Sequence, residues 1–162
     1  MKIFGKSLSE YVRFERGFLI LILVVGLARL ILSLLGMPNS AVKFISITVA
    51  LLLGMLYYSV TVHTSGFGSY KQLLPVLALP VILGSCIVIT GIVISILTHK
   101  NNIFSAPEFS GGVDGKNWGH VGAHAVAAIV LSLIFWAVGS LIMLVTKKVT
   151  GGRAGVPEAP AH

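Results

Sequence analysis

Residues 17–36 read GFLILILVVGLARLILSLLG, a run in which Arg29 is the only charged side chain. About 20 apolar residues are needed to cross the hydrocarbon core of a bilayer as a helix. Three further runs reach this length, at about residues 41–62, 73–98 and 120–146. Backbone groups in lipid must find partners within their own segment, and the runs lack the alternating pattern of barrel strands. Each run is therefore predicted to be a transmembrane helix.

The composition of the 162-residue chain agrees with this prediction. Hydrophobic residues make up 56% of the chain and charged residues only 10%, and the mean hydropathy is +0.96. A soluble domain of this size is far more polar. The net charge of +7 does not indicate a nucleic-acid partner, because the basic residues flank apolar runs instead of alternating with aromatic residues. We expect an all-α integral membrane protein, with residues 1–150 forming one four-helix bundle.

The basic residues also predict the orientation of the bundle. If the amino terminus is cytoplasmic, the cytoplasmic segments carry eight Lys and Arg residues and the other side carries three. The eight are Lys2, Lys6, Arg13, Arg16, Lys71, Lys147, Lys148 and Arg153, against Lys43, Lys100 and Lys116. The positive-inside rule then places both termini in the cytoplasm, and we expect the cytoplasmic membrane of a bacterium. Residues 151–162, rich in Gly and Pro, are expected to form a disordered cytoplasmic tail.

The first helix is predicted to begin before the apolar run. Ser7 and Glu10 have the spacing of a capping box, which indicates a helix start near Leu8. A cleaved secretory signal peptide is the rival interpretation of this segment. The run is longer than the usual 7 to 15 residue signal core, and Arg29 interrupts it, so we favour a retained helix.

Small residues recur at helical spacing in the runs. Without a hydrophobic drive between helices in lipid, small residues allow the close approach that packing needs. They favour a compact bundle, and also self-association or binding to another membrane protein; the residues are Ser46, Ala50, Gly54, Gly84, Gly91, Ser95, Gly119, Ala123 and Ala127.

Arg29 is costly in a membrane span, on the order of 3 kcal/mol on insertion scales. No acidic residue lies in the four runs to pair with it. Arg29 shares a helical face with Gly26, Ser33 and Gly36, which predicts that its side chain points into the bundle and serves a site. The alternative is that Arg29 snorkels over ~10 Å to the outer headgroups.

Three histidines are expected on the same outer side as Arg29. His120 and His124 are one helical turn apart at the start of the fourth run, and His99 ends the third. A b-type haem would take His99 with His120 or His124 as ligands, and Arg29 beside a propionate. A quinone or lipid headgroup would need only hydrogen-bond donors and an apolar hole. Histidines that bind loop carbonyls or water at a helix end fit the same pattern.

A metal ion is a further possibility at His120 and His124. Their spacing supplies two ligands, and His99, Glu108 or Asp114 could supply a third. Glu108 and Asp114 lie in the loop of residues 100–117, whose Pro and Gly residues are typical of a loop that folds over something. Asp114 could also cap the fourth helix.

No catalytic motif is present in the sequence: there is no nucleophile elbow, no phosphate loop after a strand, and no carboxylate pair in the membrane. We therefore predict a small polytopic membrane protein without catalysis of its own, acting as a structural or accessory subunit or a homo-oligomer. One alternative is an electron-transfer subunit that binds haem b or a metal. A second alternative is a small transporter or a lipid-binding or quinone-binding protein.

Overall fold

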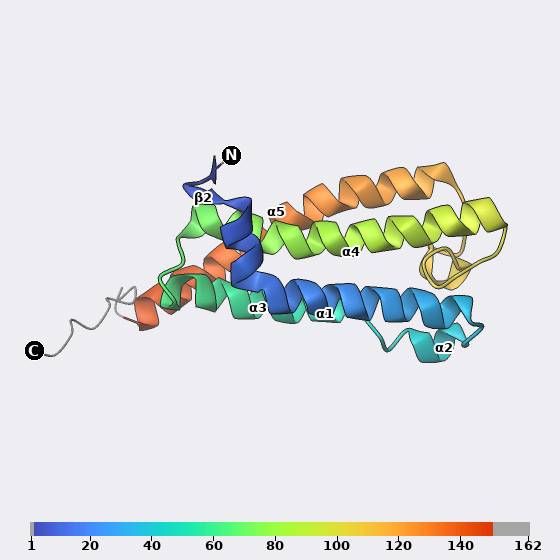
Figure 1. The fold of residues 1–162 in the computed structure, drawn as a ribbon, viewed down its shortest axis with the longest axis horizontal. Coiled ribbons are helices and arrows are strands. Elements are labelled where there is room, and N and C mark those ends of the chain that lie inside the picture. The colour runs from blue at the N-terminus through green and yellow to red at the C-terminus, as the bar shows by residue number, and fades with distance from the viewer. Residues whose placement is uncertain (1, 151–162) are drawn as a thin grey trace, which may run out of the picture.

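The computed structural model describes residues 2–150 and is almost entirely helical (Figure 1). The predicted tail, residues 151–162, lies outside the described part. Four helical segments are long and apolar enough to cross a membrane, as the sequence predicts: Leu8–Leu34, Asn39–Thr64, Tyr70–Thr98 and Trp118–Val149. The elements in chain order are β1 (Lys2–Ile3), β2 (Lys6–Ser7), α1 (Leu8–Leu34), α2 (Asn39–Val42), α3 (Ile47–Thr64), α4 (Tyr70–Thr98), a 3-10 helix (Pro107–Phe109) and α5 (Trp118–Val149).

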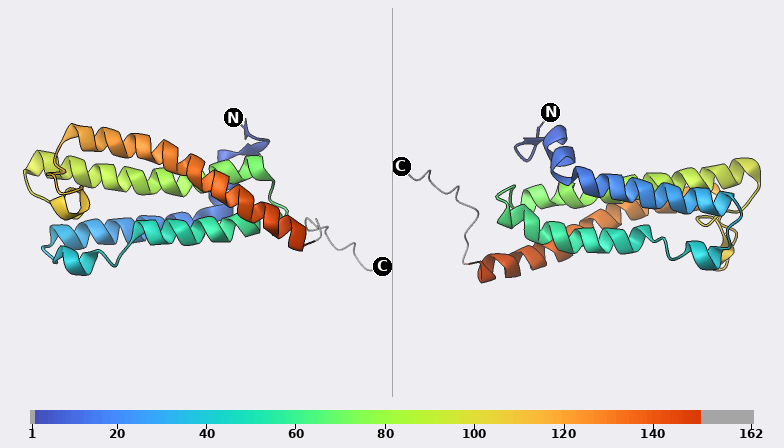
Figure 2. Two further views of the ribbon diagram at one scale, coloured as in Figure 1. Left: turned by 180° about the vertical axis from the view of Figure 1, so that it is seen from behind. Right: turned by 60° about the horizontal axis from the view of Figure 1, so that its bottom comes forward.

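The long helices lie side by side along the long axis of the molecule (Figures 1 and 2). One end of the bundle holds β1, β2 and the last turns of α5, and we call it the terminal end. The opposite end holds α2 and the connection between α4 and α5, and we call it the loop end. An even number of crossings thus brings the start and the finish of the described chain to the same end.

The first helix begins and ends with two well-formed caps. Ser7 and Glu10 form the predicted capping box, in which the Ser7 amide donates to Glu10 Oε2 over 2.7 Å. At the other end, Gly36 has a positive φ of 85°, and the Met37 amide donates to the Leu32 carbonyl over 3.0 Å. This pattern is a Schellman motif, which favours Gly at that position. Gly36 therefore ends the helix and does not extend the Arg29 face.

Two elements differ from the sequence prediction. Residues 2–7 form a short two-stranded hairpin that the sequence did not predict; Gln72 Nε2 donates to the Phe4 carbonyl over 2.7 Å and holds the hairpin against α4. The second run, predicted as a helix from about residue 41, is broken: α2 ends at Val42 and α3 begins at Ile47. The Ser46 hydroxyl accepts from the Val49 amide at 3.3 Å, which caps the new helix and explains where it begins.

The small residues of the helices are used largely inside the chain. A side chain at Gly54 would meet Phe18, and one at Gly91 would meet Phe104. Large apolar side chains such as Val24 and Leu141 are instead exposed along the outside of the bundle. The close helix approach that the sequence predicts is thus intramolecular at these glycines.

Candidate ligand cavity at the loop end

The loop between α4 and α5 turns back into the bundle. Residues 102–106 are all buried, and we call them the plug. Three hydrogen bonds join the plug to the helices: Asn102 Nδ2 to the Gly91 carbonyl at 2.6 Å, the Ile103 amide to Ser33 Oγ at 2.8 Å, and Ser105 Oγ to Ser95 Oγ at 2.8 Å. The plug therefore closes the loop end of the bundle with paired polar groups.

Glu108 and Asp114, the two predicted loop candidates, support the loop itself. Asn39 Nδ2 donates to Glu108 Oε1 over 2.6 Å, and this bond lowers the pKa of Glu108 below its ordinary value. The Lys116 amide donates to Asp114 Oδ1 over 3.0 Å, and this bond, with the nearby Lys116 ammonium, lowers the pKa of Asp114. Both carboxylates are thus held by hydrogen bonds at the loop end, outside the four long helices.

Asp114 is not the cap of the fourth helix, contrary to the sequence prediction. Asn117 is the N-cap of α5, and its Oδ1 accepts from the His120 amide at 2.8 Å. Asp114 lies three positions before Asn117 and cannot fill this role, because the N-cap residue directly precedes the first helical turn.

A cavity of about 370 Å³ lies next to the plug, among α1, α3, α4 and α5. Its wall is mostly apolar and includes Leu51, Val88 and Phe104. The polar side chains that line it are Arg29 from α1, Thr48 from α3, Ser85 from α4 and His124 from α5. Two of the four residues predicted from the sequence, Arg29 and His124, thus share one cavity.

Arg29 points into the bundle rather than along it. Its guanidinium carbon lies 5.4 Å from the centre of the Phe104 ring, a cation–π geometry. Its Nε atom is buried and has no hydrogen-bond partner among residues 2–150. The ion pairs found in this described range, Lys6 with Glu10 and Lys116 with Asp114, do not include Arg29. The cavity therefore has a cation in its wall without a protein anion to match it.

His120 and His124 contact each other directly. Their Nε2 atoms are 3.1 Å apart, and His120 Nδ1 lies 3.0 Å from the Gly115 carbonyl oxygen. His120 also lines a smaller outer pocket of about 240 Å³ next to Gly115 and Ser110. The pair thus extends from this outer pocket to the cavity that holds Arg29.

Among the described residues, the structure does not gather the three metal ligands that the sequence suggested. His99 is the exposed C-cap of α4, in a left-handed conformation with φ of 55°. Within residues 2–150, no group of three or more His, Cys, Asp or Glu side chains could hold a metal ion. The Nε2 atoms of His120 and His124 bind each other, so an axial bond to haem would require this contact to break.

Glu15 is a buried polar residue that the sequence reasoning did not single out. It is fully buried in α1, and neither carboxyl oxygen has a hydrogen-bond partner among the described residues. The helix is kinked there, with φ of −113° and ψ of 16°. The sequence contained a signal for this burial. Ile22, Gly26 and Leu30 share one face of the helix. The positions seven and eleven residues before Ile22 lie on the same face, and they are Glu15 and Tyr11.

The cavity combines an apolar wall with a guanidinium, two hydroxyls and an imidazole. A volume of a few hundred Å³ with a few convergent polar groups is typical of sites for small organic ligands. Chemically, this lining suits a molecule with an apolar body and an acidic head. No protein-family model, curated protein or solved structure matches the chain.

Proposed function

We propose that the protein is a small multi-pass membrane protein, without catalysis of its own, that binds an anionic amphiphile in the cavity at the loop end. One observation carries the proposal: the Arg29 guanidinium lines an apolar cavity and has no anion beside it among residues 2–150. A desolvated cation without a partner is costly, and a bound anion offsets that cost. The ligand head is therefore expected to carry a negative charge.

The rest of the cavity suits the apolar part of such a ligand. Leu51, Val88 and Leu131 supply wall from three different helices, and Phe104 and Phe109 supply it from the loop. Burial of alkyl groups against this wall is favourable by roughly 25 cal/mol for each Å² removed from water. The cavity therefore supports a lipid, and not a free inorganic anion, as the ligand.

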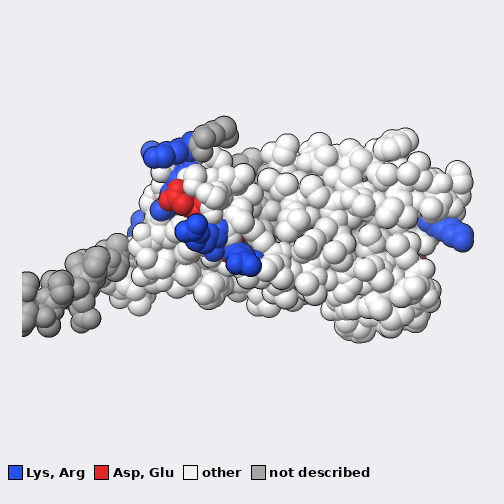
Figure 3. Space-filling view, in the orientation of Figure 1, with Lys and Arg blue, Asp and Glu red and all other residues white. Residues whose placement is uncertain are grey.

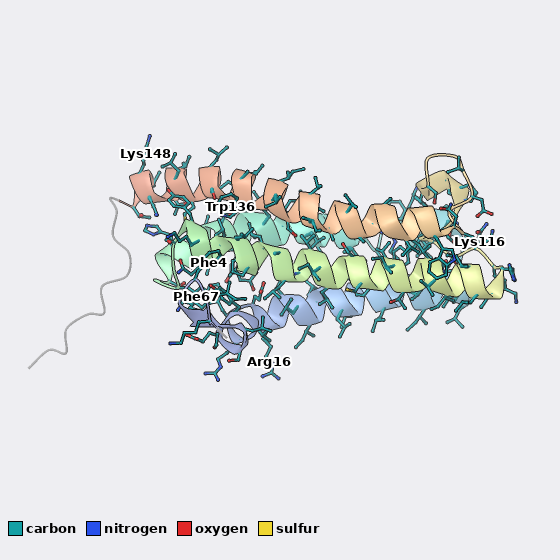
Figure 4. The ribbon with its side chains drawn as sticks, turned by 90° about the horizontal axis from the view of Figure 1, so that it is seen from above. Phe4, Arg16, Phe67, Lys116, Trp136 and Lys148 are labelled. Atoms are coloured by element: carbon teal, nitrogen blue, oxygen red, sulfur yellow. The ribbon has the colours of Figure 1, made fainter. Side chains whose placement is uncertain are left out.

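Membrane placement is supported by the surface of the bundle. Apolar side chains such as Leu53, Val126 and Leu141 are exposed, as expected where lipid is the solvent. Basic side chains gather at the terminal end (Figure 3), and Figure 4 shows Arg16 and Lys148 at that end and Lys116 at the other. With the positive-inside rule, the terminal end is cytoplasmic and the cavity lies toward the outer leaflet.

Association with a partner is a second proposed role. The outer part of α5 keeps an exposed face: a side chain at Gly122 would meet nothing within 4 Å, and Val126 and Ile129 follow at helical spacing. This face supports an accessory subunit or a homo-oligomer. Size-exclusion chromatography with light scattering, on the protein and on Gly122→Leu, measures self-association; a monomer in both samples would contradict the homo-oligomer.

The lipid proposal is tested on the purified chain in a neutral detergent. Native mass spectrometry and thermal melts are recorded with anionic, zwitterionic and neutral lipids that share the same acyl chains. We expect the anionic lipids to bind most tightly. Arg29→Leu should lose this preference, and Arg29→Lys should restore it only in part, because a point ammonium does not reproduce a planar fork.

Arg16→Leu is the matched control for this experiment, because Arg16 is an exposed arginine at the terminal end of the same helix. Its lipid preference should equal that of the unmodified chain. An Arg29→Leu protein that binds anionic lipids as well as before would contradict the proposal.

A further inference from the structure

The hydrogen bonds of the two histidines determine which ring nitrogens carry hydrogen. His120 Nδ1 lies 3.0 Å from the Gly115 carbonyl oxygen, and a carbonyl oxygen only accepts. The hydrogen is therefore on His120 Nδ1. In a neutral imidazole the second nitrogen is then an acceptor, so His120 Nε2 accepts and His124 Nε2, 3.1 Å away, donates.

The same reasoning extends to the cavity. If His124 Nε2 carries the only hydrogen of a neutral ring, His124 Nδ1 has a free lone pair and accepts. His124 lines the cavity together with Arg29, the other titratable side chain in its wall. The residues that line the cavity thus include a cation that attracts an anion and an imidazole with one nitrogen able to accept a hydrogen bond.

The Gly115 carbonyl, the first acceptor in this series of hydrogen bonds, is held in place. Its oxygen also accepts from the Asn117 amide at 2.9 Å, and the Gly115 amide donates to the Ser105 carbonyl in the plug at 3.0 Å. A side chain at Gly115 would lie 2.8 Å from His120 Nδ1, so only glycine permits this approach. The neighbouring charges, Asp114 and Lys116, pair with each other at 3.1 Å. The arrangement of hydrogens is therefore built into the loop.

We propose that the bound amphiphile ends in a phosphate monoester, whose anionic oxygen pairs with Arg29 and whose remaining P–OH donates to His124 Nδ1. This assignment rests on the proposed function and names the head of its ligand. A singly protonated monoester carries both a negative charge and an acidic hydroxyl, and an apolar cavity favours this monoanion over the dianion.

The charged or polar groups of other common lipid heads, each taken alone, match only one of the two residues. The phosphate of a diester has the charge but no P–OH, and an ionised carboxylate likewise has no hydroxyl. A quinol has hydroxyls but no charge for Arg29, and a quinone has only acceptors. None of these groups alone supplies both the charge for Arg29 and the donor for His124 Nδ1, and a diester would need a further hydroxyl or ammonium in its headgroup to supply that donor.

The test compares two lipids that differ at one oxygen. Dioleoyl phosphatidate is a monoester with a P–OH; dioleoyl phosphatidylmethanol has the same chains and a methyl group on that oxygen. Binding to the full chain is measured at pH 7 by native mass spectrometry. We expect phosphatidate to bind about tenfold more tightly, the effect of one additional hydrogen bond in the cavity. Equal affinities would overturn the proposal, with no variant needed.

Variants locate the effect at the histidines. His124→Leu should reduce the tenfold ratio to about one and leave the affinity for phosphatidylmethanol unchanged. His120→Leu should also lower the ratio, because His120 acts as a positioning residue that determines which His124 nitrogen accepts. If either histidine had a purely structural role, its replacement would weaken the binding of both lipids alike. His99→Asn, at the exposed left-handed cap of α4, is the control and should keep the ratio.

Two further arms separate this inference from the proposed function and from other phosphates. If both lipids bind in an Arg29-dependent way with equal affinity, the monoester assignment fails and anionic-lipid binding stands; if neither lipid binds, the proposed function fails. Inorganic phosphate should not displace phosphatidate at equal concentration, and displacement would overturn the lipid assignment. Hexadecyl phosphate should displace it, because the monoester head and an apolar chain are shared.

Discussion

The two ends of the bundle each hold an ionisable side chain of α1 in apolar surroundings. At the loop end, Arg29 lines a cavity of about 370 Å³ and its guanidinium lies near the Phe104 ring. At the terminal end, Glu15 is fully buried, and the cavities found among the described residues do not include it. The proposed function therefore uses the unpartnered group that adjoins open space, Arg29, and not the one that is only buried, Glu15.

Aromatic side chains pack near Glu15, and the cavity of about 460 Å³ at the terminal end lies elsewhere, between α3 and α5 beside Thr64 and Val149. Phe67, from the short connection between α3 and α4, stacks on Phe14 with ring centres 3.8 Å apart. Tyr11 meets the edge of Phe67 at 5.7 Å, and Tyr58 lies 5.7 Å from Phe14. Large rings fill volume that aliphatic side chains leave open. At the loop end, a single loop enters between the helices, and its five-residue plug leaves the cavity beside it.

The largest expected effect is a difference between Arg29 and Glu15 variants in how much lipid stabilises them. At a phosphatidate concentration of a hundred times the dissociation constant, binding should stabilise the unmodified chain by about 2.7 kcal/mol. Arg29→Leu should lose this gain, and Glu15→Leu should keep it. Thermal melts with and without the lipid measure both. If Glu15→Leu also lost the stabilisation by phosphatidate, the two ends would be coupled, and the contrast drawn between them would be wrong.

The plug is expected to matter next. Asn102→Ala removes the bond to the Gly91 carbonyl and an acceptor for the Phe104 amide, so it should lower the free energy of unfolding by about 2 kcal/mol. Asn101→Ala, at the exposed neighbour, is the control and should change it far less. Chemical denaturation in mixed micelles measures both variants. Equal losses would mean that the buried bonds of the plug do not hold the loop end.

A smaller effect is expected at Glu15 in the absence of lipid. Glu15→Leu replaces an unpartnered buried carboxyl with an apolar side chain of similar volume, and should raise the free energy of unfolding by about 1 kcal/mol. Glu10→Gln is the control, since Gln preserves the capping box. The same denaturation assay applies. A loss of stability in Glu15→Leu would indicate that the carboxyl binds a group in the native protein.

The smallest effect concerns the exposed bond between Glu108 and Asn39. The Asn39 amide lowers the pKa of Glu108 below its ordinary value of 4.5. A lowered carboxyl pKa contributes stability above the ordinary value, and that contribution is lost as pH falls through the pKa of the folded state. Melting temperatures between pH 7 and pH 3 should therefore fall less in Glu108→Gln than in the unmodified chain. An identical pH profile would show that this bond does not hold the loop.

Local sequence signals predicted the helices well because their causes are local. The capping box at Ser7 depends on a residue three positions away, and the lengths of the apolar runs determine the helical segments. The bond of the plug from Ile103 to Ser33 and the Asn39 contact to Glu108 join residues about 70 positions apart. No periodicity encodes such pairs, so the buried loop and the cavity beside it emerge only from the tertiary structure.

The plug also bears on the order in which the protein is assembled during synthesis. Within the described residues, its three hydrogen bonds to helices go to α1 and α4, which both precede it in the chain. A nascent chain that has emerged as far as residue 106 already contains every helical partner of the plug. The plug can therefore be completed before α5 leaves the ribosome. The last helix then packs beside an existing template, with its first turn capped by Asn117.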